Sequence, residues 1–294
     1  MGRSLYEANP HVRELYQEAS EVLGYDIAAL CFKGPSEKLN LTEYTQPALL
    51  VTSLAARSLF DQLQCQPSAV AGHSLGEYSA IVAAGGLSFS QAVKLVQKRG
   101  QYMSEAVAPG TGLVAAVLGL SEEEVTRACE DAKSEGVVAP ANFNCPGQIV
   151  IAGEKVAVEK TISLLKERGA RRVMPLPVSV PVHTPLMQVA ADRLQADVAT
   201  MDWSDLNVPL VNNAEATALI KIEDVRTSLI RQLPSPVQWS QSIQSMAKMG
   251  VDTFIEVGPG KVLSGLVKRI LPNATIWNVA DTKSFQSVRS SLAS

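Results

Sequence analysis

Ala71-Gly72-His73-Ser74-Leu75-Gly76-Glu77-Tyr78-Ser79-Ala80 is the stretch that decides the fold. A short apolar run over residues 68–71 precedes it, and a helical pattern follows it. The order strand, Gly-x-Ser-x-Gly, helix is typical of a nucleophile elbow, in which a serine hydroxyl stands out from a sharp turn. Because Gly72 and Gly76 lack a Cβ, the pattern predicts a strained turn with neighbouring backbone packed closely beneath it.

The position of Ser74 at the start of a helix has a chemical consequence. Backbone N–H groups of the first turn, including that of Leu75, would be aimed at an oxygen that develops negative charge. The sequence therefore predicts Leu75 as one donor of an oxyanion hole. A Gly-x-Ser-x-Gly string also arises by chance, with the serine merely capping a helix. The motif alone leaves both interpretations open.

Length and composition limit the classes of function. A chain of 294 residues can bury a full α/β core with one inserted subdomain. The net charge is −3 and the pI about 5.7, with charges scattered along the chain, so neither a nucleic-acid partner nor a membrane surface is indicated. The four cysteines show neither metal-ligand spacing nor a disulfide framework; they are Cys31, Cys65, Cys129 and Cys145. We expect no metal, no cofactor and a cytoplasmic location, since no signal peptide is recognisable.

Three helices with one apolar face each are predicted at residues 11–30, 45–64 and 88–107. Pro47 would stand at the start of the second, where a proline is tolerated. In the third, Arg99 falls inside the apolar arc, and no carboxylate lies on the same face. A guanidinium that points inward needs an anion. A structural ion pair, a snorkelling side chain and capture of a substrate carboxylate remain alternatives.

Residues 110–180 follow the order β-α-β-β-α-β, which is that of a ferredoxin-like unit. The expected strands cover residues 113–118, 137–142, 148–152 and 172–176, and the helices 121–133 and 156–167, the first opened by a capping box of Ser121 and Glu124. We therefore predict an inserted small domain at 110–180 and a large α/β domain formed by 1–109 and 181–294. A cleft between the two bodies would be a favoured ligand site.

His183 comes directly after the insertion and is one of three histidines. His11 fits a surface helix, and the side chain of His73 should point away from its neighbour Ser74. If the elbow is catalytic, a base must take the hydroxyl proton, and His183 is the remaining candidate. The alternative is a histidine that packs at the domain junction.

The last third of the sequence completes the α/β body. Strands are expected at 208–212, 253–257 and 274–279, and helices at 224–233, 237–249 and 262–270. Gly258-Pro259-Gly260 predicts a tight strand-to-helix turn, because the longer glycine spacing of a phosphate loop is missing.

Several motifs together closely resemble the malonyl-CoA:acyl carrier protein transacylases of bacterial fatty acid synthesis, almost from end to end. Besides the elbow, Arg99 and Pro181-Val182-His183, they are Thr45-Gln46-Pro47-Ala48, Asn142-Phe143-Asn144 with Pro146-Gly147-Gln148, Val211-Asn212-Asn213, Arg231-Gln232-Leu233 with Ser235-Pro236-Val237-Gln238-Trp239, and Glu256-Val257-Gly258-Pro259-Gly260-Lys261. The resemblance implies an α/β-hydrolase-like large domain with a parallel sheet and an inserted ferredoxin-like small domain.

The resemblance also implies a ping-pong transfer of malonyl from malonyl-CoA to the phosphopantetheine thiol of acyl carrier protein. Ser74 would carry the malonyl ester, His183 would act as the base, and Arg99 would hold the malonyl carboxylate. A main-chain carbonyl near Gln232 would orient His183, and the substrate pocket would include Gln46, Met103 and Asn144. A monomer is expected.

One departure from the family concerns the start of the chain. Family members begin with an apolar strand and a Gly-Gln-Gly-Ser-Gln turn, whereas this sequence starts at Met1-Gly2. The resemblance therefore implies that the first strand and a second oxyanion donor lie outside the sequence, at a cost of about 10²–10³ in rate for the donor alone. Two further hypotheses stay open: a catalytically impaired form that binds carrier protein, and a serine esterase or thioesterase that uses water as the acceptor.

Overall fold

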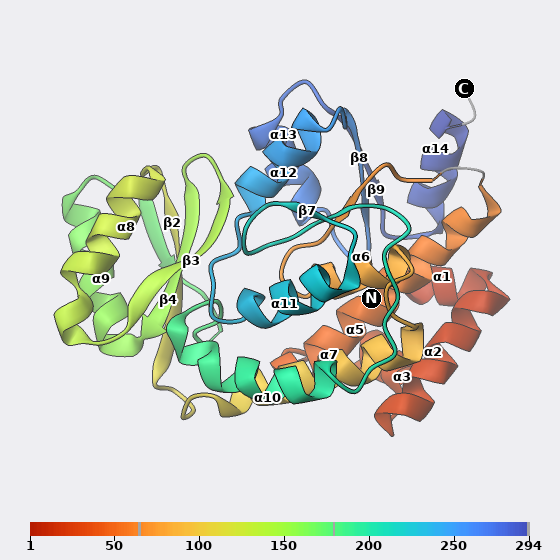
Figure 1. Cartoon of the computed structure of the whole chain (residues 1–294), viewed down its shortest axis with the longest axis horizontal. Helices are drawn as coiled ribbons and strands as arrows, with labels where there is room; N and C mark the ends of the chain where they lie inside the picture. The colour runs from red at the N-terminus through yellow and green to blue at the C-terminus, as the bar shows by residue number, and fades with distance from the viewer. Residues whose placement is uncertain (64–65, 179, 293–294) are drawn as a thin grey trace.

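The computed structural model describes residues 1–63, 66–178 and 180–292, which form a large body and a smaller one beside it (Figure 1). Cys65 and the end of the helix predicted for 45–64 lie outside the described residues. The small body is an insertion between two parts of the large body, and the α/β class predicted from the sequence is confirmed.

The N-terminal part of the large body is entirely helical. Its elements are α1 (Arg3–Ala8), α2 (Pro10–Leu23), α3 (Ile27–Lys33), α4 (Ser36–Leu39), α5 (Thr42–Arg57) and a 3₁₀ turn, η1 (Ser58–Gln62). The single helix predicted at 11–30 is two helices, because Gly24 ends α2 at φ 75° and Asp26 caps α3 by accepting from the Ala29 amide. Pro47 lies inside α5 and not at its start, since that helix begins three residues earlier than expected.

The elbow strand and its neighbours build the rest of the large body. Its further elements are β1 (Val70–Ala71), α6 (Gly76–Ala83), α7 (Phe89–Glu105), η3 (Pro185–Met187), α10 (Gln188–Val198), β6 (Leu210–Val211), β7 (Ala218–Leu219), α11 (Ile222–Gln232), α12 (Trp239–Lys248), β8 (Thr253–Val257), α13 (Val262–Ile270), β9 (Thr275–Val279) and α14 (Thr282–Leu292). The parallel strands occur as two pairs, β1 with β6 and β8 with β9, and the short β7 adds an antiparallel edge. The sequence patterns do not predict α1, α4, β7 or α14.

The small body has the predicted order of elements: β2 (Gly112–Leu118), α8 (Glu122–Asp131), a 3₁₀ turn η2 (Lys133–Glu135), β3 (Val138–Cys145), β4 (Gln148–Glu154), α9 (Lys155–Glu167) and β5 (Arg172–Pro175). Its antiparallel sheet has the order β3-β4-β2-β5, which is the ferredoxin-like arrangement. Ser121 and Glu124 form the expected capping box. Helices α8 and α9 lie on the outer side of this sheet, away from the large body (Figure 1).

Backbone hydrogen bonds join the small body to the large one. The Phe143 amide of β3 donates to the Val237 carbonyl at 2.9 Å, and the Val237 amide donates to the Ala141 carbonyl at 2.9 Å. The segment before α12 thus runs beside β3 as a short parallel bridge. This junction holds the sheet of the small body in a fixed position next to the elbow. The exact domain limits, 109/110 and 180/181, stay a prediction.

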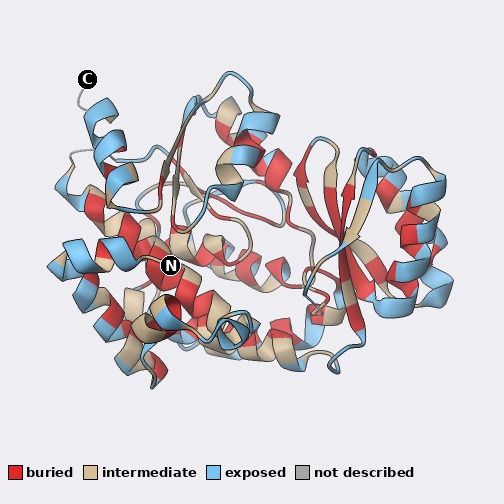
Figure 2. Cartoon of the chain, turned by 180° about the vertical axis from the view of Figure 1, so that it is seen from behind, coloured by how far each residue is buried: buried red, intermediate tan, exposed pale blue. Residues whose placement is uncertain are grey.

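Buried side chains fill the centre of each body (Figure 2). One cluster packs α5, α6, α7 and α10 together, and a separate cluster lies between the small sheet and its two helices. The elbow therefore rests on a rigid helical layer. Among the described helices, none combines the length and the apolar character that crossing a membrane requires.

Candidate active site

Ser74 lies in the turn between β1 and α6 with a φ of 51°, in the left-handed region. Such a conformation is costly for a residue with a side chain and persists only where neighbours impose it. Asn213 does so: its Oδ1 accepts from the Ser74 amide at 2.6 Å, and its Nδ2 donates to the Gly72 carbonyl at 2.7 Å. One asparagine thus fixes both sides of the turn and leaves the serine hydroxyl facing inward.

The two elbow glycines have different roles. A Cβ on Gly72 would lie 2.0 Å from the carbonyl carbon of Gly76 and 2.5 Å from the Glu77 amide nitrogen, so only glycine fits there. A Cβ on Gly76 would meet nothing within 4 Å. The expectation that both glycines permit close packing is right for Gly72 and wrong for Gly76, because the strain of the turn is concentrated on Ser74.

His183 contacts the elbow serine. The Ser74 Oγ lies 2.8 Å from His183 Nε2, and His183 Nδ1 lies 2.9 Å from the main-chain carbonyl oxygen of Gln232. A carbonyl can only accept, so Nδ1 carries the proton and Nε2 is free to accept from the hydroxyl. Burial lowers the pKa of His183 to about 3, helped by the nearby Arg99 charge. The imidazole is therefore neutral near pH 7.

Arg99 reaches the same point from α7 and is 1% exposed. Its NH2 donates to Ser74 Oγ at 3.1 Å and to Gln232 Oε1 at 2.9 Å, and its NH1 donates to Gln46 Oε1 at 2.6 Å. All of these acceptors are neutral, and Arg99 forms no ion pair with any carboxylate of the described residues. Desolvation lowers the pKa of Arg99, but a guanidinium stays protonated in proteins. The site therefore holds a buried cation without a direct counter-ion.

The other predicted site residues lie around this centre. Gln46 donates from Nε2 to Thr42 Oγ1 at 2.9 Å and lies 3.4 Å from Met103 Sδ, so both predicted pocket residues touch the Arg99 end of the site. Asn144 on β3 accepts through its Oδ1 from His73 Nε2 at 2.8 Å, because an amide oxygen can only accept and the histidine must therefore donate. His73 therefore points towards β3 of the small body, whereas the sequence predicted only that it points away from Ser74.

Leu75 is the N-cap residue of α6. Within the part of the chain that the structure describes, its amide N–H has no hydrogen-bond partner, as is usual for the first residues of a helix. It remains available as a donor to an oxyanion. The Ser74 amide, in contrast, is already bound to Asn213.

Sequence reasoning assigned no role to three buried polar side chains, those of Glu77, Gln232 and Asn213. Glu77 is fully buried and accepts through Oε2 from Gln232 Nε2 at 2.8 Å and from the Asn213 amide at 3.0 Å. The Gln232 side chain also donates to the Ser74 carbonyl at 3.0 Å. The sequence does show that Glu77 is a polar residue of the helix, three residues after Ser74, and this could have pointed to it. Its hydrogen-bond partners, however, come from distant segments of the chain.

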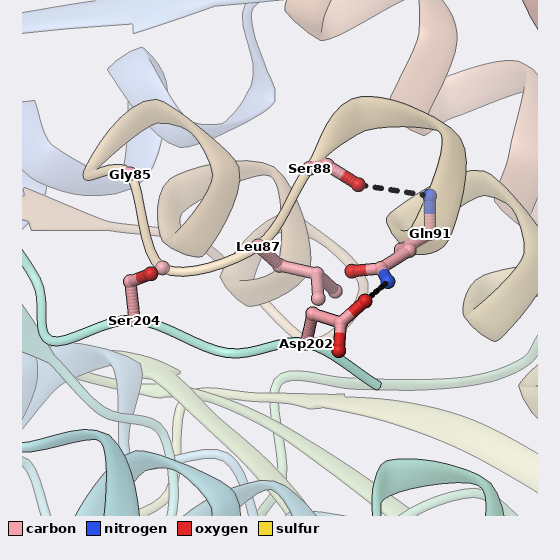
Figure 3. A pocket seen from close by; sticks show the side chains of 7 residues that line it. Gly85, Leu87, Ser88, Gln91, Asp202 and Ser204 are labelled. Carbon is pink, nitrogen blue, oxygen red and sulfur yellow. Dashed lines mark hydrogen bonds between the residues drawn. The ribbon is translucent and has the colours of Figure 1, made fainter. Parts of the chain in front are cut away.

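A shallow depression elsewhere on the large body does not contribute to this centre. The Gln91 side chain crosses its floor and donates to Asp202 at 2.9 Å (Figure 3). The residues that line it are Gly85, Gly86, Leu87, Ser88, Gln91, Asp202 and Ser204, none of which contacts Ser74, His183 or Arg99. Within the described ranges, no group of three or more histidine, cysteine, aspartate or glutamate side chains is placed to hold a metal ion.

Comparisons with known proteins place this site in context. The family model described as acyl transferase domain matches residues 1–288. The malonyl CoA-acyl carrier protein transacylase of Escherichia coli strain K12 is 49% identical over 267 residues, 90% of this chain and 86% of that protein. The enzyme of the same name from Bacillus subtilis strain 168 is 45% identical over 287 residues, 97% of this chain and 90% of that protein.

Two solved structures superpose on this chain over nearly its whole length. An acyl carrier protein S-malonyltransferase from Vibrio cholerae superposes with a TM-score of 0.96 at 48% identity and covers 98% of this chain and 94% of its own. The complex of a type II PKS acyl-carrier protein with its malonyl-transacylase gives a TM-score of 0.96 at 44% identity, over 99% of this chain and 94% of that one.

Proposed function

The chain belongs to the acyl transferase domain family, and from this membership and the geometry of its site we infer that it transfers the malonyl group of malonyl-CoA to acyl carrier protein. It is an acyltransferase, as its relatives' names indicate, and we propose that it acts in fatty acid synthesis. Its two partners are malonyl-CoA and the carrier protein, whose phosphopantetheine thiol is the acceptor we propose. A monomer in the cytoplasm remains our expectation.

The observation that carries this inference is the buried Arg99 guanidinium without a counter-ion, 3.1 Å from the nucleophile candidate. A buried cation is costly unless an anion compensates it. A malonyl thioester brings a carboxylate two bonds beyond the reacting carbonyl, which matches the arginine's place beside the serine hydroxyl. We propose that Arg99 binds that carboxylate as a planar fork, with Gln46 holding the guanidinium through NH1 and Met103 lying against the Gln46 side chain.

In the first half-reaction, the Ser74 hydroxyl gives its proton to His183 Nε2 and its oxygen attacks the thioester carbonyl carbon. The carbonyl oxygen becomes an oxyanion and accepts from the Leu75 N–H. Collapse of this intermediate breaks the carbon–sulfur bond, and His183 returns the proton to the leaving CoA sulfur. The product is a malonyl ester on Ser74.

In the second half-reaction, the thiol of the carrier protein takes the place of CoA. His183 accepts the thiol proton, the sulfur attacks the ester carbonyl, and the Ser74 oxygen leaves with the proton that His183 holds. The Gln232 carbonyl supports both halves, since it keeps the Nδ1 proton in place and so leaves Nε2 as the working nitrogen.

The direct test is the mass of the protein after incubation with malonyl-CoA and no acceptor. We expect one malonyl group per chain in the wild type, located on the peptide that contains Ser74, and none in Ser74→Ala. Ser79→Ala, altered in the helix α6 that follows the Ser74 turn, is the matched control and should be acylated like the wild type. Acylation of Ser74→Ala to the wild-type level would refute the assignment of the nucleophile.

A further inference from the structure

Glu77 is a buried carboxylate that the reaction scheme above does not use. It is the second residue of α6, is 0% exposed, and turns towards the catalytic centre. Its Oε2 accepts from Gln232 Nε2 at 2.8 Å and from the Asn213 amide at 3.0 Å, whereas its buried Oε1 has no hydrogen-bond partner in the described chain. A buried carboxylate with one unpaired oxygen destabilises the fold, so a structural role alone does not explain its presence.

The Gln232 amide connects Glu77 to Arg99. Its Nε2 donates to the carboxylate, and its Oε1 accepts from Arg99 NH2 at 2.9 Å. The two charges thus lie on opposite ends of a single amide group and do not touch. Each stabilises the charged form of the other. Since Arg99 has no carboxylate against its own nitrogens, Glu77 is the nearest anion that the fold supplies to it.

We propose that Glu77 is a positioning residue that serves as the relayed counter-charge of Arg99 and thereby limits how tightly the site holds the malonyl carboxylate. This inference rests on the proposed function. When the malonyl group binds, its carboxylate takes over the compensation of Arg99, and two anions then share one cation across the Gln232 amide. The repulsion between the two carboxylates weakens malonyl binding. The malonyl group is then not held so tightly that its transfer to the acceptor is slowed.

Protonation of Glu77 relieves this repulsion. Burial raises the pKa of Glu77 to about 7, and the arriving carboxylate raises this pKa further because it cancels the Arg99 charge that favours the ionised form. Binding of a malonyl donor near pH 7.5 should therefore be accompanied by uptake of a proton, and affinity for malonyl should fall as the pH rises. Acetyl donors lack the second carboxylate and should show neither effect.

The other groups that face Glu77 do not titrate in this range. Tyr78 on the same helix has its pKa raised to about 12 by burial, and the pKa of His183 is lowered to about 3. Arg99 on α7 remains a cation, and Gln232 and Asn213 carry no charge. The remaining carboxylate that acts on Glu77 is Glu215, in the turn after β6, where it pairs with Arg231.

The test compares donor binding in two proteins that cannot react, Ser74→Ala and Ser74→Ala with Glu77→Gln. The glutamine can keep both accepted hydrogen bonds through its oxygen and place its NH₂ where Oε1 has no partner, so the fold should survive. Titration calorimetry of malonyl-CoA and acetyl-CoA from pH 6 to 8.5, in buffers of different ionisation enthalpy, gives the Kd and the protons taken up. Both donors carry the same CoA phosphates, so their ratio isolates the malonyl carboxylate.

With Glu77 present, we expect the preference for malonyl-CoA to fall on the order of tenfold from pH 6 to 8.5 with net proton uptake. With Glu77→Gln the preference should be constant and stay at its low-pH value. Glu215→Gln in the Ser74→Ala background is the matched control and should keep the pH dependence.

A preference that does not change with pH, or that changes equally in the Glu77→Gln protein, overturns the inference while the proposed reaction stands. Malonyl-CoA that binds no better than acetyl-CoA at any pH, in a protein whose wild type is not malonylated, overturns the proposed reaction itself and this inference with it.

Discussion

Replacing Arg99 by methionine should change the choice of acyl donor more than the stability of the fold. A hydrogen bond to a charged group contributes about 1.5–3 kcal/mol, so two bonds to a malonyl carboxylate would contribute about 3–6 kcal/mol. In the resting site, however, NH1 and NH2 already donate to Gln46, Ser74 and Gln232. NH2 has both of its protons engaged, so a carboxylate must displace a neutral acceptor there, whereas NH1 keeps one free proton and the buried Nε has no partner. The displaced acceptor favours the lower part of that range.

We therefore expect Arg99→Met to lower kcat/KM for acylation by malonyl-CoA about 10²–10³-fold. Acylation by acetyl-CoA should be retained or become faster. The Arg99 charge is the second largest cause of the low pKa of His183, so its removal makes the imidazole a stronger base. Unfolding should change little, because loss of a buried charge that has no direct counter-ion offsets the unpaired amide oxygens left on Gln46 and Gln232.

Rapid-quench measurement of Ser74 acylation by intact-protein mass gives kcat/KM for malonyl-CoA and for acetyl-CoA in separate experiments. Lys98→Met is the matched control: it removes a cation from the neighbouring position of α7, where Lys98 pairs with Asp197, and should leave the ratio of the two donors unchanged. An equal decrease for malonyl-CoA and acetyl-CoA in Arg99→Met would refute the role of Arg99 in recognition and leave it a structural residue.

Two further predictions concern stability. Gly72→Ala should lower the free energy of unfolding by at least about 3 kcal/mol or prevent folding, because its Cβ would lie 2.0 Å from the Gly76 backbone. Gly76→Ala should stay within about 1 kcal/mol of the wild type. Urea denaturation of both variants measures these changes, and equal stability of the two would contradict the packing described. The raised pKa of Glu77 contributes stability to the wild type that is complete below pH 4.5 and is lost as the pH rises through 7. Glu77→Gln should therefore gain stability relative to the wild type between pH 4.5 and 7, by up to about 3 kcal/mol. A difference in unfolding free energy that is constant over this pH range would exclude the raised pKa.

Local signals in the sequence predicted much of this structure. The capping box at Ser121, the alternation of strands and helices over 110–180 and the elbow around Ser74 all depend on neighbouring residues, and each lies where expected. The break at Gly24 was missed because apolar spacing continues across it, although a glycine after an apolar run is a known helix end.

The parts that sequence could not supply depend on contacts between distant segments. Asn213 holds the Ser74 turn from 139 residues away, and Gln232 reaches Glu77 across 155 residues. No periodicity encodes such partners. The inward position of Arg99 followed from helical spacing, but the absence of an internal carboxylate beside it could be seen only when α5, α7 and α11 were placed together.

The site keeps several costly features at one point, and two of them, the missing counter-ion and the weak base, have a common cause. Ser74 and His183 both adopt positive φ, Arg99 lacks a touching counter-ion, and the imidazole is too weak a base in the resting state. A malonyl carboxylate bound to Arg99 cancels the charge that suppresses the basicity of His183. In the proposed reaction, the anion that identifies the correct donor would thus also raise the pKa of His183, the group proposed to take the Ser74 proton. A donor without that carboxylate leaves the charge in place and meets a weaker base, so recognition and activation are coupled through one guanidinium.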